Sequence, residues 1–75
     1  MTPRERMAAI LLECADDHMI APELIRGRSV QSEAVAARYD YVRRVHSAIG
    51  TSRSHTSRVT GFDRKTVGKA LAHEV

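Results

Sequence analysis

Residues 56–71 read Thr-Ser-Arg-Val-Thr-Gly-Phe-Asp-Arg-Lys-Thr-Val-Gly-Lys-Ala-Leu, and the rest of the chain is organised around this stretch. Gly61 ends a short helix, because glycine enters the left-handed backbone region without steric cost. Asp63 then caps a second helix by accepting free backbone N–H groups of its first turn. Apolar residues recur at helical spacing from Val67 to Leu71 and define the buried face of the second helix. The stretch therefore predicts two helices joined by a tight turn.

The second helix, which we expect to span residues 63–74, opens with Arg64, Lys65 and Thr66. In a helix-turn-helix protein, this end of the recognition helix meets base edges in the major groove of DNA. Gly68 lies inside the helix, where glycine costs about 1 kcal/mol relative to alanine. It either permits close approach of the preceding helix or of DNA, or is simply tolerated. The pattern predicts a helix-turn-helix that binds double-stranded DNA.

Two helices are expected before the longest one. The capping box Thr2-Pro3-Arg4-Glu5, with proline at the first helical position, begins the first helix. Residues 21–27 form a short helix that starts near a proline and stops at a glycine. The apolar stripe of the first helix follows at steps of three and four and consists of Met7, Ile10, Leu11, Cys14 and His18.

The longest helix is expected over residues 31–49, ending at Gly50, and should be the spine against which the other helices pack. A polar fourth helix over residues 54–60 is capped by Thr51 or Ser54. No strand-like alternation is present, so the sequence predicts an all-α single domain, residues 1–75, of about five helices ending in a helix-turn-helix. The inner stripe of the longest helix is Val35, Tyr39, Val42, His46 and Ile49, flanked by Tyr41 and Val45.

Charge is distributed unevenly along the 75 residues, whose formal net charge is +3. Residues 1–25 hold two basic and five acidic residues, a balance of −3, whereas residues 26–75 hold ten basic and four acidic residues, a balance of +6. A concentration of positive charge favours a phosphate-binding face. A solvated basic surface without a ligand has the same composition, so the helix-turn-helix pattern decides between the two.

The composition also bears on the compartment. The single cysteine, Cys14, excludes an intramolecular disulfide and fits a reducing environment. Residues 1–6 are charged, and the apolar run over residues 7–12 is too short for a signal peptide. No run of about 20 apolar residues is present to cross a membrane. We therefore predict a cytoplasmic protein with no membrane partner.

Two resemblances support the DNA-binding interpretation. Residues 56–67 resemble the helix-turn-helix of many bacterial regulators and transposases, although Thr56 replaces the usual aliphatic residue. The chain as a whole, over about residues 5–75, is similar to the C-terminal DNA-binding domain of the replication initiator DnaA. This similarity implies a bacterial or phage regulator of transcription or replication. It rests on Ile-Ala-Pro-Glu-Leu-Ile-Arg-Gly-Arg-Ser in residues 20–29, on Ala37-Arg38 in the long helix, and on Asp63 followed by Thr66-Val67.

The DnaA resemblance implies roles for particular residues. Arg28 falls close to the arginine that the family inserts into the minor groove, and Arg38 matches a phosphate-contacting arginine. Residues 63–66 fall on the segment that reads bases. The family's Gly-Arg-Asp-His signature is Gly-Phe-Asp-Arg in residues 61–64, so we expect a target other than the initiator's own sequence box. The sequence has no Gly-x-x-x-x-Gly-Lys-Ser/Thr loop, so we expect no ATP-driven activity from this chain.

The expected DNA contacts form three groups. Arg64 and Lys65 reach base edges, where the O6 and N7 acceptors of guanine suit arginine best. Thr66 and Lys69 contact a base or the adjacent phosphate. The remaining contacts hold the DNA backbone, with Arg53, Ser54, Ser57 and Arg58 on one side and Arg38 and Arg43 on the other.

One helix-turn-helix reads only a few base pairs, so useful specificity needs a second copy or a second module. We therefore expect a homodimer, or a partner protein that binds the acidic first helix. The alternative function is a protein-interaction adaptor or antitoxin-like module that keeps the helix-turn-helix fold with little DNA binding. The polar composition of the fourth helix favours this alternative.

Other candidate chemistry is weak. The four histidines and Cys14 lack zinc-finger or metalloprotease spacing. Nothing near Asp16 and Asp17 in the sequence would raise the pKa of either carboxyl group, and no histidine and acid are placed to activate a serine. We predict no enzyme activity, no cofactor and no metal site.

Overall fold

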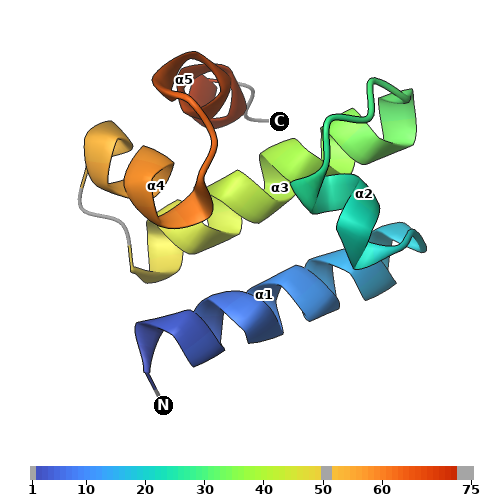
Figure 1. Ribbon diagram of the computed structural model, residues 1–75, viewed down its shortest axis with the longest axis horizontal. Coiled ribbons are helices and arrows are strands. Elements are labelled where there is room, and N and C mark those ends of the chain that lie inside the picture. Colours follow the sequence, from blue (N-terminus) through green and yellow to red (C-terminus); the bar gives the residue numbers. More distant parts are fainter. Residues whose placement is uncertain (1, 50–51, 73–75) are drawn as a thin grey trace.

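The computed structural model describes residues 2–49 and 52–72, and these residues form helices, turns and loops without a strand. The protein is therefore all-α, as the sequence predicts. Its helices, shown in Figure 1, are α1 (Pro3–His18), α2 (Pro22–Arg26), α3 (Ser32–Ala48), α4 (Arg53–Thr60) and α5 (Arg64–Ala72).

Helix α3 runs through the middle of the molecule and contacts each of the other four helices. Helices α1 and α2 pack on one side of α3, and α4 and α5 pack on the other (Figure 1). The prediction that the longest helix is the spine is confirmed. None of the helices in the described part of the chain is long and apolar enough to cross a membrane.

Two clusters of buried side chains pack against α3. Phe62, in the turn between α4 and α5, packs against both clusters. The Phe62 ring meets the Tyr41 ring edge to face, with 6.2 Å between the ring centroids. The turn is therefore fixed to the spine through an aromatic contact. The larger cluster contains Leu11, Cys14, Ala15, Ile25, Ala37, Tyr41 and Val45, and the smaller contains Val42, Val67 and Ala70.

The buried face of α3 differs from the predicted single stripe. Tyr41 and Val45, expected beside the stripe, are buried, whereas Val42 is the one member of the predicted stripe that is buried. The prediction is wrong because α3 packs on two sides, so its buried residues cannot lie on one line. The other buried residues of α3 are Ala34 and Ala37, and the predicted stripe residues Val35, Tyr39, His46 and Ile49 are partly buried.

Local signals in the sequence set most helix ends. The Thr2 side chain accepts a hydrogen bond from the Glu5 N–H at 3.2 Å, which confirms the start of α1. Gly61 has φ = 80° and ends α4 as predicted. Asp63 Oδ1 accepts the Thr66 N–H at 2.8 Å and caps α5. On the predicted stripe of α1, Leu11 and Cys14 are buried and Met7, Ile10 and His18 are partly buried.

The predicted cap of α4 is wrong. The capping residue is Ser52, whose hydroxyl accepts the His55 N–H at 3.1 Å. Ser54 lies inside the helix, and Thr51 lies outside the described residues. Gly50, expected to end the longest helix, and residues 73–74, expected to end the second helix of the pair, also lie outside the described residues.

Candidate nucleic-acid interface

The hydroxyl groups of α4 hold the helix-turn-helix together. Thr56 is fully buried, and its Oγ1 lies 2.8 Å from Nδ1 of His46 on α3. Thr60 donates its hydroxyl to the Thr56 carbonyl at 2.7 Å, and Ser57 donates its hydroxyl to the Phe62 carbonyl in the turn. The hydroxyl groups of α4 thus form hydrogen bonds to α3, within α4, and to the turn that leads into α5.

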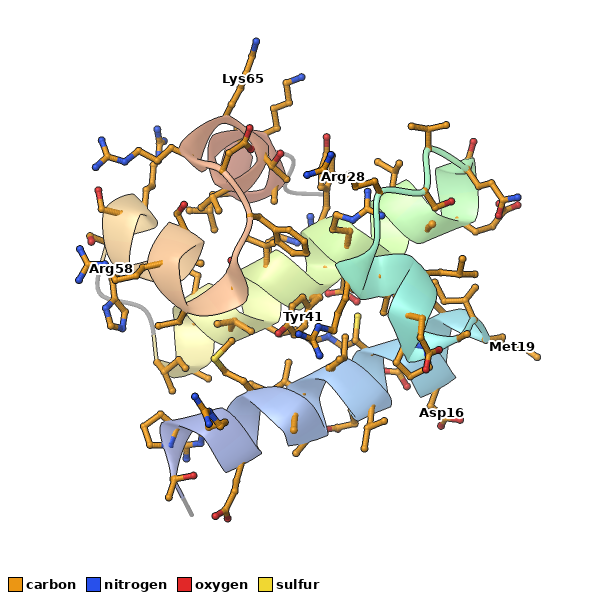
Figure 2. The ribbon with its side chains drawn as sticks, viewed as in Figure 1. Asp16, Met19, Arg28, Tyr41, Arg58 and Lys65 are labelled. Atoms are coloured by element: carbon orange, nitrogen blue, oxygen red, sulfur yellow. The ribbon has the colours of Figure 1, made fainter. Side chains whose placement is uncertain are left out.

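Helix α5 separates an apolar face from a cationic one. Val67 and Ala70 are fully buried against α3, whereas Arg64, Lys65 and Lys69 are exposed. Lys65 points away from the body of the protein in Figure 2. The cations lie on a helix that is anchored by its opposite side, which is the arrangement that a recognition helix requires.

Two more exposed arginines accompany these cations. Arg53, at the start of α4, approaches α5: its Nη1 lies 3.9 Å from the position of a Cβ added at Gly68. Arg28 follows α2 and lines a groove together with Asp63 and Thr66 at the start of α5. Figure 2 shows Arg28 and Lys65 on the same side of the molecule. We call the exposed cations Arg28, Arg53, Arg64, Lys65 and Lys69 the basic face.

Three other residues that were predicted to contact DNA, Ser54, Ser57 and Arg58, have surroundings unlike those of the basic face. Arg58 lines a groove between α1 and α4, beside Arg4 and Arg26, and lies well away from Lys65 in Figure 2. Ser57 donates its hydroxyl within the turn, as described above. Ser54 is partly buried. The structure therefore does not bring Arg58 onto the basic face.

Arg38 and Arg43 make bonds inside the protein. Arg38 donates from Nε to the Ile25 carbonyl at 2.8 Å and from Nη2 to the Leu24 carbonyl at 2.9 Å. Arg43 donates from Nη1 to the Ala70 carbonyl of α5 at 3.3 Å. Both arginines thus bind backbone carbonyls near the ends of helices, where cations are favoured by the helix dipole. In this structure they fasten α2 and α5 to the spine.

Helix α1 carries several exposed acidic residues. Glu13 and Asp16 are exposed, as are Leu12, at 60%, and Met19, at 90%. Figure 2 places Asp16 and Met19 on the side of the molecule opposite Lys65. Asp17 is bound by Arg44 at 2.8 Å. A partner protein that binds the acidic first helix would therefore leave the basic face uncovered.

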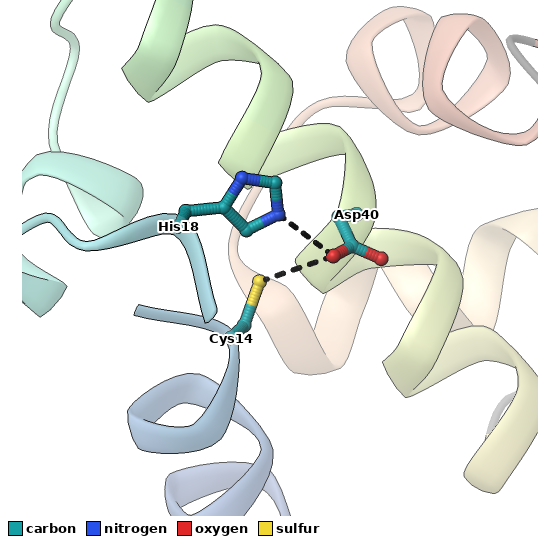
Figure 3. Close-up of side chains that lie close together, drawn as sticks. All are labelled: Cys14, His18 and Asp40. Atoms are coloured by element: carbon teal, nitrogen blue, oxygen red, sulfur yellow. Dashed lines mark hydrogen bonds and ion pairs between the residues drawn. The ribbon is translucent and has the colours of Figure 1, made fainter. Parts of the chain in front are cut away.

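Sequence reasoning missed a second cluster, between α1 and α3. His18 Nε2 lies 2.8 Å and Cys14 Sγ 3.8 Å from Oδ2 of Asp40 (Figure 3). Burial and the neighbouring Asp40 raise the pKa of the Cys14 thiol to about 11, so a nucleophilic thiolate is disfavoured. The spacing of Cys14 and His18, four residues apart, indicates a shared helix face, but nothing in the sequence identifies Asp40 as the third member.

Comparison of the chain with family models, curated proteins and solved structures finds no significant match. The similarity to the DnaA domain therefore rests on the sequence motifs quoted above. What the chain binds is argued below from its own residues.

Proposed function

We propose that this protein is a sequence-specific double-stranded DNA-binding protein, a small regulator of transcription or replication similar to the C-terminal domain of DnaA. The observation that carries the proposal is the two-sided character of α5. Val67 and Ala70 anchor the helix, and Arg64, Lys65 and Lys69 are exposed on it. A recognition helix needs both properties, because it must be held rigidly while its free side enters the major groove.

The chemistry of the basic face suits both bases and phosphates. The guanidinium of Arg64 can donate two parallel hydrogen bonds to the O6 and N7 of guanine, and Lys65 can donate to the same acceptors. Lys69 lies on α5, and Arg53 approaches α5 from the start of α4; both suit phosphate contacts, which set the register of the protein on the duplex. Arg28, across the groove from the start of α5, suits the neighbouring minor groove, where narrow A·T tracts concentrate negative potential.

The adaptor alternative loses the observation that favoured it. The polar residues of α4 suggested a helix released from the packing that DNA binding requires. Thr56, Ser57 and Thr60 instead make hydrogen bonds to α3, to the turn and within α4. Their polarity therefore has a local structural cause, and DNA binding is the function that we put to the test.

Selection of bound sequences from a random pool of double-stranded DNA would provide the site, and mobility shifts would then measure affinity. We expect Arg64→Ala to cost about 1–3 kcal/mol of binding free energy and to relax the preference at one position of the site. Arg6→Ala is the matched control, because Arg6 is exposed on α1 and outside the basic face. This variant should bind as the unaltered protein does.

Two results would contradict the proposal. Failure to enrich any sequence, together with no mobility shift even at low salt, would favour the adaptor, since a protein that contacts several phosphates binds tightly at low salt. Equal affinity and equal preference for Arg64→Ala and Arg6→Ala would show that α5 is not the recognition helix. Circular dichroism of each variant establishes that it is folded.

A further inference from the structure

The cluster between α1 and α3 contains three different metal-ligand types. Cys14 and His18 lie four residues apart on α1, one helical turn, and therefore share a face. Asp40 projects from α3 between them, and the sulfur, imidazole nitrogen and carboxylate oxygen all lie within 4.8 Å of one another (Figure 3). Thiolate sulfur, imidazole nitrogen and carboxylate oxygen are the three ligand types that bind zinc in proteins.

Two of the three distances between ligand atoms are within about half an ångström of those of a tetrahedral site, and the third pair, Cys14 Sγ and His18 Nε2, lies within 4.8 Å. Zinc bonds of about 2.0–2.3 Å place neighbouring ligand atoms roughly 3.3–3.6 Å apart. Cys14 Sγ lies 3.8 Å and His18 Nε2 lies 2.8 Å from Asp40 Oδ2. The imidazole and carboxylate would therefore separate by about half an ångström, which a change in side-chain rotamers permits. The metal would take the place of the thiol proton and of the proton between His18 and Asp40.

Charged side chains surround the cluster and offset part of the charge of a divalent ion. Arg44 donates from Nε to Asp40 Oδ1 at 3.2 Å, and its Nη2 lies 2.8 Å from Asp17 Oδ2 and 3.0 Å from Asp40 Oδ2, the oxygen that would bind the metal. With a Cys14 thiolate, the carboxylates of Asp40 and Asp17, and the guanidiniums of Arg44 and of Arg43, whose Nη2 lies 3.9 Å from Asp40 Oδ1, the surroundings carry a charge of −1, and a bound Zn²⁺ leaves a net charge of +1. Arg44 also orients the Asp40 carboxylate, as a second layer of hydrogen bonds does at known zinc sites.

The cluster is partly open to solvent, and the Asp40 side chain is 22% exposed. Cys14 is fully buried, whereas the His18 side chain is 29% exposed. An ion can therefore enter past His18, with water as its fourth ligand. The geometry points to a Zn²⁺ site formed by Cys14, His18 and Asp40 that ties α1 to the spine. Domains of this size often rely on such a staple, because a core of 75 residues supplies little stability.

The test uses untagged, chelator-treated protein and Zn²⁺ alone as the ligand. We expect calorimetry to show one equivalent bound and the unfolding midpoint to rise with Zn²⁺ concentration. Co²⁺ in place of Zn²⁺ should give the near-ultraviolet charge-transfer absorption of a thiolate ligand. Cys14→Ala should abolish that absorption, and both Cys14→Ala and His18→Gln should raise the Kd at least about tenfold, since even outer residues of zinc sites contribute that much.

His55→Gln is the control, because His55 lies on α4 and outside the cluster, and it should leave the Kd unchanged. If Cys14→Ala does not fold, His18→Gln and the Co²⁺ spectrum of the unaltered protein still decide the question. Absence of Zn²⁺ binding would overturn the inference and leave the cluster as a hydrogen-bonded contact between helices. Binding that is unaffected by both cluster variants would overturn it as well. None of these measurements involves DNA, so the result is independent of the proposed function.

Discussion

Thr56 occupies a position where helix-turn-helix proteins usually carry an aliphatic side chain. Its hydroxyl is buried but satisfied, because Nδ1 of His46 lies 2.8 Å away. A buried hydroxyl without such a partner would cost about 1–3 kcal/mol. The pairing of Thr56 with His46 explains how a polar residue can stand at the crossing of α3 and α4.

Gly68 leads to a prediction about the stability of the protein. A Cβ added at this position meets only Nη1 of Arg53 at 3.9 Å, an ordinary contact, so the protein's own packing does not require glycine. We expect Gly68→Ala to raise the free energy of unfolding by about 0.5–1 kcal/mol, because alanine loses less backbone entropy in a helix. Urea unfolding measures the change.

Gly61→Ala is the control, because we expect it to lower the stability of the protein instead of raising it. Its φ of 80° is a left-handed conformation, so alanine should destabilise the protein by about 1–2 kcal/mol. A destabilised Gly68→Ala would mean that the helices need a closer approach than the structure has. A stabilised Gly68→Ala variant that binds DNA less tightly would instead assign the glycine to close approach of the nucleic acid.

At the scale of elements, Arg38 fastens α2 to the spine. Its guanidinium donates to the carbonyls of Leu24 and Ile25 at 2.9 and 2.8 Å. Arg38→Ala removes two charge-assisted hydrogen bonds and should lower the free energy of unfolding by about 1–3 kcal/mol. Arg64→Ala, at an exposed position, should change it by no more than about 0.5 kcal/mol. If Arg38→Ala instead left stability unchanged and weakened binding to all DNA sequences alike, Arg38 would act as a phosphate contact.

The cap of α5 makes a prediction about pH. Hydrogen bonds from the Thr66 side chain and backbone lower the pKa of Asp63 below its ordinary value of 3.8. A group whose pKa is lower in the folded state stabilises that state above its unfolded pKa, and this stabilisation is lost as the pH falls through the folded pKa. The Asp63 contribution should therefore be complete at neutral pH and decline below about pH 3.8.

Asp63→Asn isolates this effect, because asparagine still accepts the Thr66 N–H but does not ionise in this range. The difference in unfolding midpoint between the unaltered protein and Asp63→Asn should be positive at neutral pH and shrink in acid. Thermal unfolding followed by circular dichroism at a series of pH values measures it. A difference that stays constant from neutral pH to pH 3 would contradict the assigned cap.

How much of the structure could be predicted from the sequence depends on how far apart along the chain the interacting residues lie. Caps and stops act within about four residues, so the starts of α1 and α5 and the end of α4 were predictable from Thr2, Asp63 and Gly61. The sequence could not predict which of several neighbouring hydroxyl groups caps α4. Ser52 caps this helix in place of the predicted Thr51 or Ser54. The partners of Arg38, and the meeting of Asp40 with α1, depend on how helices cross and have no local signal.

At the scale of the whole molecule, the fold places charge on separate sides. Asp16, on the helix with the excess of acid, lies on the side opposite Lys65 in Figure 2. Such a separation orients a protein towards a polyanion before contact. If the basic face binds a duplex as proposed, Asp16 would be turned away from that duplex and would be open to a second copy or a partner protein.

The basic face sets how strongly salt should weaken DNA binding. Each neutralised phosphate contributes about −0.9 to the slope of log K against log salt concentration. If Arg28, Arg53, Arg64, Lys65 and Lys69 each meet one phosphate or the adjacent groove, one copy of the chain gives a slope no steeper than about −4.5. A dimer on a two-fold site should approach twice that value.

Mobility shifts at several salt concentrations measure this slope, and light scattering of the complex counts the copies. Lys69→Ala should reduce the magnitude of the slope by about 1 without changing the preferred sequence, because a phosphate contact carries no base information. A slope near zero would mean that the basic face does not meet the DNA backbone. A single bound copy with a slope well beyond −4.5 would require further contacts, either from exposed Arg26, which lines the same groove as Arg28, or from Arg38, Arg43 or Arg58.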